Sequence, residues 1–353
     1  MKSPFGSASA GVDDHAAADK MLPSQGSRPP RRSNKKKFVI GGAIIAIIVI
    51  IALAVGLGVG LTRKHNKASD VDIDHFNSTG ELGNAPNRTA MWRPAVDTKW
   101  QIVLSRPLDL DNGDGYPVTP QATVYDIDVF DNPQQTIQRL QTAGIRVICY
   151  FSAGSYEDWR PDKGAFLESD MGKPLDGWKG ERWLNVSSEN VRSIMRQRIK
   201  LAASKGCDAI DPDNIDGYDN SNGIDLTQEQ AADYIRFLSR EAAQYNMTTG
   251  LKNAAGIVDD VLDDVAFSVN EECKEKSECT SYDGFINANK PVFNIEYPKD
   301  AGNGLSDSSK NRFCDDSKQE NAGSNRFSTV IKKMNLDGWV QYCDGERVES
   351  KTL

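Results

Sequence analysis

Two aspartates separated by one residue, Asp211 and Asp213, end a short apolar run and are the first candidates for chemistry. An amphipathic helical pattern ends before them at Gly206, which predicts that the run is a parallel strand of an alternating β/α chain. Such folds place their chemistry at the carboxyl ends of strands, and residues two apart on a strand share a face. Pro212 cannot donate to a sheet ladder and predicts that the strand ends there. Asp and Asn also form ordinary turns, so the other strand ends must decide between chemistry and a turn.

Acidic, aromatic and amide side chains also follow several other apolar runs. They are Asp126, Asp128, Tyr150, Tyr156, Trp159, Asn214, Lys252, Glu271, Glu272, Glu296 and Tyr297. In a barrel these strand ends converge on one cleft. Aromatic faces can stack on sugar rings, amides and carboxylates can bind hydroxyls, and two carboxylates can cleave a glycosidic bond. One carboxylic acid protonates the leaving oxygen, and the other carboxylate attacks the anomeric carbon or activates water. At this point both stereochemical outcomes stay open.

The elements that must position these side chains alternate between β-type and helical patterns. The predicted strands are 100–104, 122–127, 146–151, 182–186, 208–211, 248–251, 265–269, 291–295 and 338–342. The predicted helices are 134–143, 189–203, 227–243, 257–262 and 324–334. We interpret this order as an α/β fold of the (β/α)8 TIM-barrel type, with strand 100–104 peripheral because nine candidates compete for eight places. A doubly wound open sheet is the alternative, but the chain has no G-x-G-x-x-G turn and no P-loop.

The N-terminal part of the chain has a different composition. Residues 1–37 are rich in Ser, Pro, Gly and charge, which predicts a disordered tail. Residues 38–62 carry no charged side chain and are long enough to cross a bilayer. They are longer and start later than the apolar core of a cleavable signal peptide, which indicates a signal anchor. Residues 63–95 are expected to be a glycosylated stalk, and residues 96–353 the (β/α)8 domain that would cleave a glycosidic bond.

Charge sets the expected orientation and partners. Residues 1–37 hold eight Lys or Arg and three Asp or Glu, so this side should remain cytosolic, as in a type II single-pass protein of the plasma membrane with its large domain outside. Residues 63–353 hold 34 basic and 47 acidic side chains, which argues against nucleic acid and fits a cationic ligand or simple solubility. The three histidines all lie before residue 76 and no C-x-x-C occurs, so no metal or other cofactor is expected.

Cysteines and sequons support a secretory route. All six cysteines follow residue 62, as do four N-x-S/T sequons at Asn77, Asn87, Asn185 and Asn246. Cys273 and Cys279 are close enough to close a small loop, and Cys314 with Cys343 could staple the C-terminal part. Cys149 and Cys207 lie in apolar runs, where either a disulfide or two buried thiols is expected.

The stretch from about Trp100 to Cys343 resembles the endo-α-1,4-polygalactosaminidases of glycoside hydrolase family 114. The motifs that carry the resemblance are 100–105 (WQIVLS), 150–160, 206–214 (GCDAIDPDN), 270–273 (NEEC) with 278–279, and 290–293 (KPVF) with 296–297. The resemblance implies a barrel that cuts an α-1,4-linked galactosamine polymer internally, as in the exopolysaccharide galactosaminogalactan. Deacetylated galactosamine is cationic, which would give an acidic cleft a purpose.

The resemblance also implies roles for individual residues. The catalytic Asp of the family falls on Asp213, the expected nucleophile of a retaining mechanism. The catalytic Glu falls within 270–272, and we prefer Glu271 to Glu272 as acid/base. Asp211 stands where many relatives have Glu, so its role is open; it and the remaining strand-end side chains are expected to bind substrate or shape the cleft. Two alternatives are a catalytically inactive glycan-binding protein of the cell surface and a glycosidase for another α-linked polysaccharide.

Overall fold

The structure is a computed structural model, and it describes residues 90–111, 118–303, 305–315 and 324–353. The expected tail, the expected membrane span and most of the expected stalk lie outside these residues. In the part of the chain that is described, no helix is both long and apolar enough to cross a membrane.

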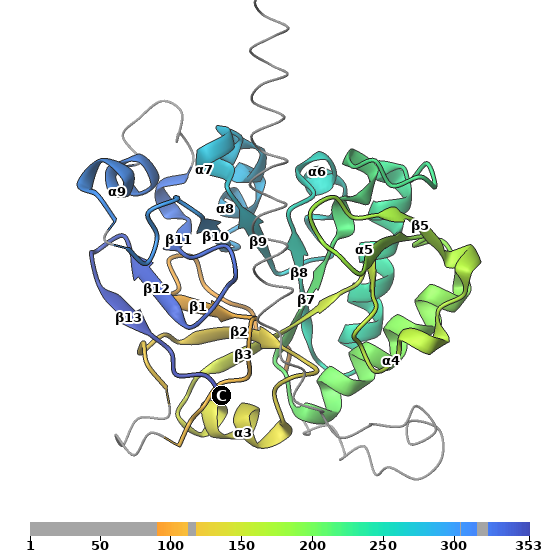
Figure 1. Ribbon diagram of the computed structural model, residues 1–353, viewed down its shortest axis with the longest axis horizontal. Helices are drawn as coiled ribbons and strands as arrows, with labels where there is room; N and C mark the ends of the chain where they lie inside the picture. Colours follow the sequence, from red (N-terminus) through yellow and green to blue (C-terminus); the bar gives the residue numbers. More distant parts are fainter. Residues whose placement is uncertain (1–89, 112–117, 304, 316–323) are drawn as a thin grey trace, which may run out of the picture. The chain divides into compact units, whose positions relative to one another are not determined.

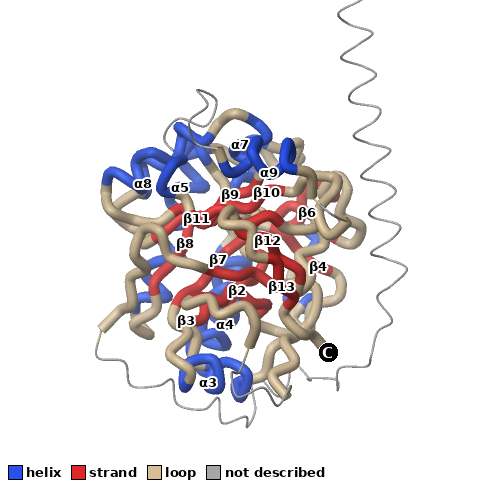
Figure 2. The backbone as a smooth tube through the Cα atoms, turned by 90° about the vertical axis from the view of Figure 1, so that its left-hand side faces the viewer, coloured by secondary structure: helices blue, strands red, loops and turns tan. Residues whose placement is uncertain are grey.

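A curled sheet of ten strands lies at the centre of the fold, with helices around it (Figure 2). The strands, in spatial order, are β1 (Trp100–Val103), β2 (Val124–Asp128), β3 (Arg146–Ser152), β7 (Ala209–Asp213), β8 (Thr248–Lys252), β9 (Phe267–Glu271), β10 (Val292–Glu296), β11 (Ser328–Ile331), β12 (Trp339–Tyr342) and β13 (Arg347–Glu349). Each pair from β1 to β11 is parallel, and β12 and β13 add on antiparallel. The fold is therefore α/β and consistent with the TIM type.

Hydrogen bonds join β1, at one edge of this curled sheet, to β11, to β12 and to the loop between them. The indole N–H of Trp100 in β1 donates to the carbonyl of Ser328 in β11 at 2.7 Å. The hydroxyl of Tyr342 in β12 donates to the carbonyl of Trp100 at 2.9 Å. Just beyond β1, the amide of Leu104 donates to the carbonyl of Leu336 at 3.0 Å.

Helices cover the outer face of the sheet, and α3 lies beside β3 and α5 beside β8 (Figure 1). They are α3 (Gln134–Thr142), α4 (Glu189–Lys205), α5 (Gln228–Ala243), α6 (Val258–Val261), α7 (Cys273–Lys276), α8 (Asp283–Asn287) and α9 (Asp307–Cys314). The ends of α4 follow local rules: the Ser188 side chain accepts from the amide of Val191, and Gly206 ends the helix with a φ of 97°. A capping box between Thr227 and Gln230 begins α5.

A second, antiparallel sheet is inserted between β3 and α4. Its strands are, in spatial order, β4 (Ser155–Glu157), β6 (Glu181–Leu184) and β5 (Met171–Pro174). The strand predicted at 182–186 corresponds to β6, so this run lies outside the central sheet. Strand 100–104 is β1, a member of the central sheet, and its predicted peripheral place was wrong.

Near the C-terminus, one prediction was wrong and another was confirmed in part. The helix expected at 324–334 is replaced mainly by β11, whose sequence Ser-Thr-Val-Ile is largely β-branched and pairs with β10 along its length. The strand expected at 338–342 exists as β12, but it runs antiparallel to β11. The parallel set is therefore completed by β11.

Aromatic rings fill the inside of the curled sheet. The ring of Phe293 lies 4.8 Å from that of Trp100 and 5.6 Å from that of Phe267, measured between centroids. Gly250 in β8 makes room for this cluster, because a Cβ there would lie 2.3 Å from the Phe267 ring. This apolar packing fills the interior near the amino ends of β1, β9 and β10. The carboxyl ends of the strands are left for polar side chains.

Three disulfides join the six cysteines. Cys273–Cys279 and Cys314–Cys343 agree with the expected pairs, and Cys149 pairs with Cys207, which settles the open question in favour of a disulfide. Of the sequon asparagines, Asn246 is exposed and Asn185 is half-buried. Asn77 and Asn87 lie outside the described residues.

Candidate active site

Lys252 lies at the centre of the polar side chains at the strand ends. It is the last residue of β8 and only 1% exposed. Its Nζ lies 3.4 Å from Oδ1 of Asp213, the last residue of β7, and 3.6 Å from Oε2 of Glu271, the last residue of β9. These two oxygens are therefore at most 7.0 Å apart, the sum of their distances to the shared nitrogen. Two carboxylates from separate strands thus meet at one ammonium group.

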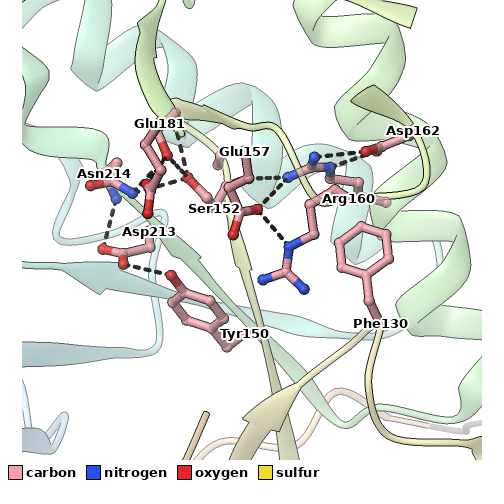
Figure 3. A network of polar contacts seen from close by, with 12 residues as sticks. Phe130, Tyr150, Ser152, Glu157, Arg160, Asp162, Glu181, Asp213 and Asn214 are labelled. Atoms are coloured by element: carbon pink, nitrogen blue, oxygen red, sulfur yellow. Dashed lines mark hydrogen bonds and ion pairs between the residues drawn. The ribbon is translucent and has the colours of Figure 1, made fainter. Parts of the chain in front are cut away.

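Hydrogen bonds from two sides orient the carboxylate of Asp213. The hydroxyl of Tyr150 in β3 donates to Oδ2 at 2.9 Å, and the amide of Asn214 donates to Oδ1 at 2.7 Å (Figure 3). The carbonyl of Asp213 accepts from the amides of Ala153 and Gly154. Gly154 is required at this close approach, because a Cβ there would lie 1.8 Å from the carbonyl oxygen of Asn214. The Asp213 segment is therefore fixed by both backbone and side-chain contacts.

Glu271 is held in a comparable way from the other side. The hydroxyl of Tyr297 donates to its Oε1 at 2.5 Å, and the side-chain amide of Asn253 donates to its Oε2 at 3.1 Å. Asn253 also accepts from the backbone amide of Glu271 at 2.9 Å. Glu272, by contrast, forms an ion pair with Lys276 on α7. Of the two neighbouring glutamates, it is Glu271 that contacts Lys252.

Residues in the left-handed conformation follow three of the strands. Asn214 has a φ of 62° after β7, Asn253 a φ of 49° after β8, and Glu272 a φ of 64° after β9. This conformation is unfavourable for residues other than glycine, although Asn tolerates it best. At three neighbouring strand ends, the backbone therefore changes direction directly after Asp213, Lys252 and Glu271. Backbone strain at such positions is characteristic of functional sites.

The charges at this centre depend on one another. Burial disfavours the ammonium of Lys252, but Asp213, Glu271 and the deeper acids outweigh this, so its pKa is raised well above its usual range. Burial alone would raise the pKa of Glu271, whereas Lys252, Tyr297 and Asn253 together lower it. The resting site therefore combines a charged lysine with an ionised Glu271.

Two further aspartates lie deeper in the interior. Asp126 in β2 and Asp211 in β7 are both 0% exposed. Burial raises the pKa of Asp211 to about 7, even though Lys252 opposes the shift. Burial and the neighbouring Asp211 raise the pKa of Asp126 well above its usual range. Lys252 thus interacts with acids beneath it as well as those at the mouth, and a contact of Asp126 or Asp211 with substrate stays a prediction.

Other expected substrate-binding residues are engaged within the fold. Asp128 is paired with Arg160, at 3.1 and 2.6 Å, and also accepts from the amides of Phe130 and Asp131. Arg160 in turn donates to Glu157 at 2.8 Å within the buried network of Figure 3. Glu296 is fully buried and accepts from the amides of Lys274 and Glu275 at the start of α7. The oxygens of Asp128 and Glu296 contact neighbouring segments of the fold, and the role of these two acids in binding substrate stays a prediction.

The aromatic residues after β3 do not all reach the same place. Tyr150 contacts Asp213, as described above. Tyr156 in β4 packs edge-on against Phe166, with ring centroids 5.6 Å apart. Trp159 is half-buried beyond β4. The structure therefore brings Tyr150 to the carboxylates and places Tyr156 in an apolar contact.

Sequence reasoning missed two residues of this centre. Asn253 holds Glu271, and its only signal was its place directly after Lys252 at a strand end. Asp216 follows Asp213 by three residues and is half-buried; burial together with Asp213 and Glu271 raises its pKa to about 6. In the described part of the chain, no group of three or more His, Cys, Asp or Glu is arranged to hold a metal ion.

The parallel sheet and its convergent carboxylates are typical of glycoside hydrolases. Glycoside-hydrolase family GH114 matches residues 82–348, and the chain belongs to this family. The resemblance noted from the sequence is thereby confirmed, and the protein is a glycoside hydrolase.

Solved structures place the chain more closely. The crystal structure of Ega3 from Aspergillus fumigatus, in complex with galactosamine, is 51% identical, covers 74% of this chain and 100% of that chain, and has a TM-score of 0.66. The glycoside hydrolase domain of PelA from Pseudomonas aeruginosa is 11% identical, covers 72% of this chain and 99% of that one, and has a TM-score of 0.50, which shows a shared fold. No curated protein matches the chain.

Proposed function

We propose that the protein is an endo-acting hydrolase of α-1,4-linked galactosamine polymer, in which Asp213 and Glu271 act on the same glycosidic bond. The observation that carries this proposal is the position of both carboxylates within 3.4 and 3.6 Å of the Lys252 ammonium. A separation of at most 7.0 Å between the facing oxygens is compatible with two carboxylates flanking one linkage, which requires roughly 5–9.5 Å.

In this mechanism Asp213 attacks the anomeric carbon and Glu271 protonates the departing oxygen. Tyr150 and the Asn214 amide hold Asp213 in place for attack, and Tyr297 and Asn253 hold Glu271. Water then hydrolyses the glycosyl ester while Glu271 accepts a proton from it, which gives net retention. Because the resting pKa of Glu271 is lowered, only its protonated fraction can act as an acid, and kcat/KM is expected to rise as the pH falls from neutral.

The substrate class follows from charge and from the relative. Asp216 is half-buried beside the two carboxylates and can accept the ammonium of a deacetylated galactosamine unit. Tyr150, Tyr297 and Asn214 would contact the sugar ring at the mouth of the cleft. The structure of Ega3 is a complex with galactosamine, which supports the same sugar as the substrate unit here.

We also propose that residues 38–62 anchor the protein in the plasma membrane with the hydrolase domain outside the cell. The uncharged length of this segment and the basic residues before it support the orientation. Three disulfides are typical of an oxidising compartment and fit an extracellular domain. The substrate is then a polymer at or outside the cell surface.

Digestion of a panel of polymers by the purified full-length protein tests the function. The panel contains α-1,4-galactosamine polymer in deacetylated and N-acetylated form and an unrelated α-linked polysaccharide. We expect the deacetylated polymer to fall rapidly in length through intermediate sizes, as internal cleavage requires. Binding without shortening would support the inactive glycan-binding alternative, and cleavage of the unrelated polymer alone would support a different glycosidase.

A further inference from the structure

A hollow of about 160 Å³ adjoins the candidate active site on the side of the inserted antiparallel sheet. Its lining includes Asp176, Trp178, Trp183, Asn214, Asn220 and Ser221. The mechanism uses none of the aromatic or charged members of this set. A hollow of this size admits a single sugar ring.

Asn214 makes the hollow continuous with the catalytic pair. Its backbone amide donates to Asp213, and its side-chain amide donates to the hydroxyls of Ser152 and Ser155 at 2.9 and 3.2 Å. Ser155 begins β4 and pairs with Trp183 in β6, which lines the hollow. One residue therefore forms both a wall of the hollow and a support of Asp213, as the position of Asn214 beside Asp213 in Figure 3 illustrates.

Trp178 presents its ring at the tip of the β5–β6 hairpin. Its side chain is 54% exposed, whereas Trp183 on the same hollow is 6% exposed. The hairpin is fixed, since the amide of Trp178 donates to Leu175 at 3.2 Å and its carbonyl accepts from Glu181 at 3.2 Å. An exposed aromatic ring on a fixed hairpin beside a polar hollow is suited to stacking on the apolar face of a sugar.

Charge selects the kind of sugar. Asp176 is exposed, two residues before Trp178, and forms no ion pair with any described residue. The ammonium of Lys173 donates to the hydroxyl of Ser221, which lines the hollow, at 3.2 Å. A carboxylate beside an open aromatic ring is complementary to a sugar that carries an ammonium group, and a neutral sugar would leave it unused.

We propose that this hollow is a second sugar-binding subsite for the polymer, in which one galactosaminyl unit stacks on Trp178 and places its ammonium at Asp176. The subsite rests on the proposed function and deepens it, because it lies beside the bond that Asp213 attacks. Asn214 and Asn220 line the hollow beside this unit. Occupation of the subsite increases the affinity for long chains and contributes nothing to oligomers too short to reach it.

Chain-length dependence of the full-length protein tests the subsite. Initial rates on deacetylated polymer and on a ladder of short galactosamine oligomers are compared for the wild type, Trp178→Ala and Trp178→Phe. We expect Trp178→Ala to raise KM for the polymer about three- to tenfold, on the scale of one aromatic stacking contact, with kcat unchanged and with the rate on the shortest cleaved oligomer unaffected. Trp178→Phe should retain most of the affinity.

A matched control and the contrary outcomes separate this inference from the proposed function. Leu167 is also large, apolar and 56% exposed on the same insertion but lies outside the hollow, so Leu167→Ala should match the wild type on every chain length. Asp176→Asn should reduce the preference for deacetylated over N-acetylated polymer. Polymer cleavage by the wild type with an unchanged KM in Trp178→Ala would overturn the subsite alone. A wild type that shortens no galactosamine chain would overturn both proposals.

Discussion

Lys252→Met is expected to lower the free energy of unfolding by about 3–5 kcal/mol, because it leaves buried acids without their counter-charge. The ammonium faces Asp213 and Glu271 at the mouth and balances Asp126 and Asp211 below, and all four depend on its charge. The same change should abolish most polymer cleavage, since the two carboxylates lose the group that holds them together. Chemical denaturation and initial rates measure the two effects.

The pH dependence of this loss has a definite sign. The pKa of Lys252 is raised in the folded protein, so its stabilisation is complete at neutral pH and is lost only when the pH rises through that value. Without Lys252 the pKa values of the acids rise further, and their protonation relieves the repulsion. Because the pKa of Asp211 is about 7 even with Lys252 present, the deficit should already begin to shrink above pH 7 and should be smaller still in acid.

A control and a contrary result accompany this prediction. Lys200 is an exposed lysine on α4, and Lys200→Met should leave both stability and activity unchanged. The residual activity of Lys252→Met should move to higher pH, because the main charge that lowers the pKa of Glu271 is gone. A Lys252→Met protein as stable as the wild type at pH 7 would show that the buried acids are neutral and that Lys252 does not organise them.

Asp213→Asn and Glu271→Gln should each lower kcat for polymer cleavage by about 10²–10⁴-fold. Each amide keeps the size of the carboxylate and one acceptor oxygen, so Tyr150 and Tyr297 retain their partners. The amides can neither attack the anomeric carbon nor transfer a proton to the leaving oxygen. Initial rates on deacetylated polymer at matched thermal stability measure this loss.

The control for these variants is an exposed acid away from the cleft. Asp259 on α6 fits, and Asp259→Asn should behave as the wild type. A variant of Asp213 or Glu271 that retained the wild-type kcat would remove that residue from the chemistry. Retained binding in both inactive variants would show that the loss lies in the bond-breaking step.

Local sequence signals predicted much of the fold. The helix beginning near Glu189 and ending before Gly206 agrees with α4, because Ser188 caps one end and the left-handed glycine the other. The place of β1 could not be predicted in this way, since the hydrogen bonds of Trp100 to residues more than 220 positions away decide it. For β11, a short strand buried in a parallel sheet lacks the alternation that would separate it from a helix.

In the site, too, distant contacts decide what the local sequence could not. Asp213 and Asp128 look alike in sequence, because both are acids at the end of an apolar run. The structure separates them, since Arg160 occupies both oxygens of Asp128 while Lys252 and Tyr150 hold Asp213 at the mouth. Glu296 was indistinguishable for a similar reason: the backbone amides of α7 that satisfy it carry no sequence signature.

The most direct test of the account is to identify the carboxylate that bonds to the sugar. A 5-fluoro-α-galactosaminyl fluoride forms a glycosyl-enzyme that hydrolyses slowly, and intact mass followed by peptide mapping locates the ester. We expect one sugar per chain, attached to Asp213, with labelling suppressed by excess galactosamine polymer. Attachment to Glu271 or to another acid, or rapid turnover to a product of inverted configuration without any adduct, would contradict it.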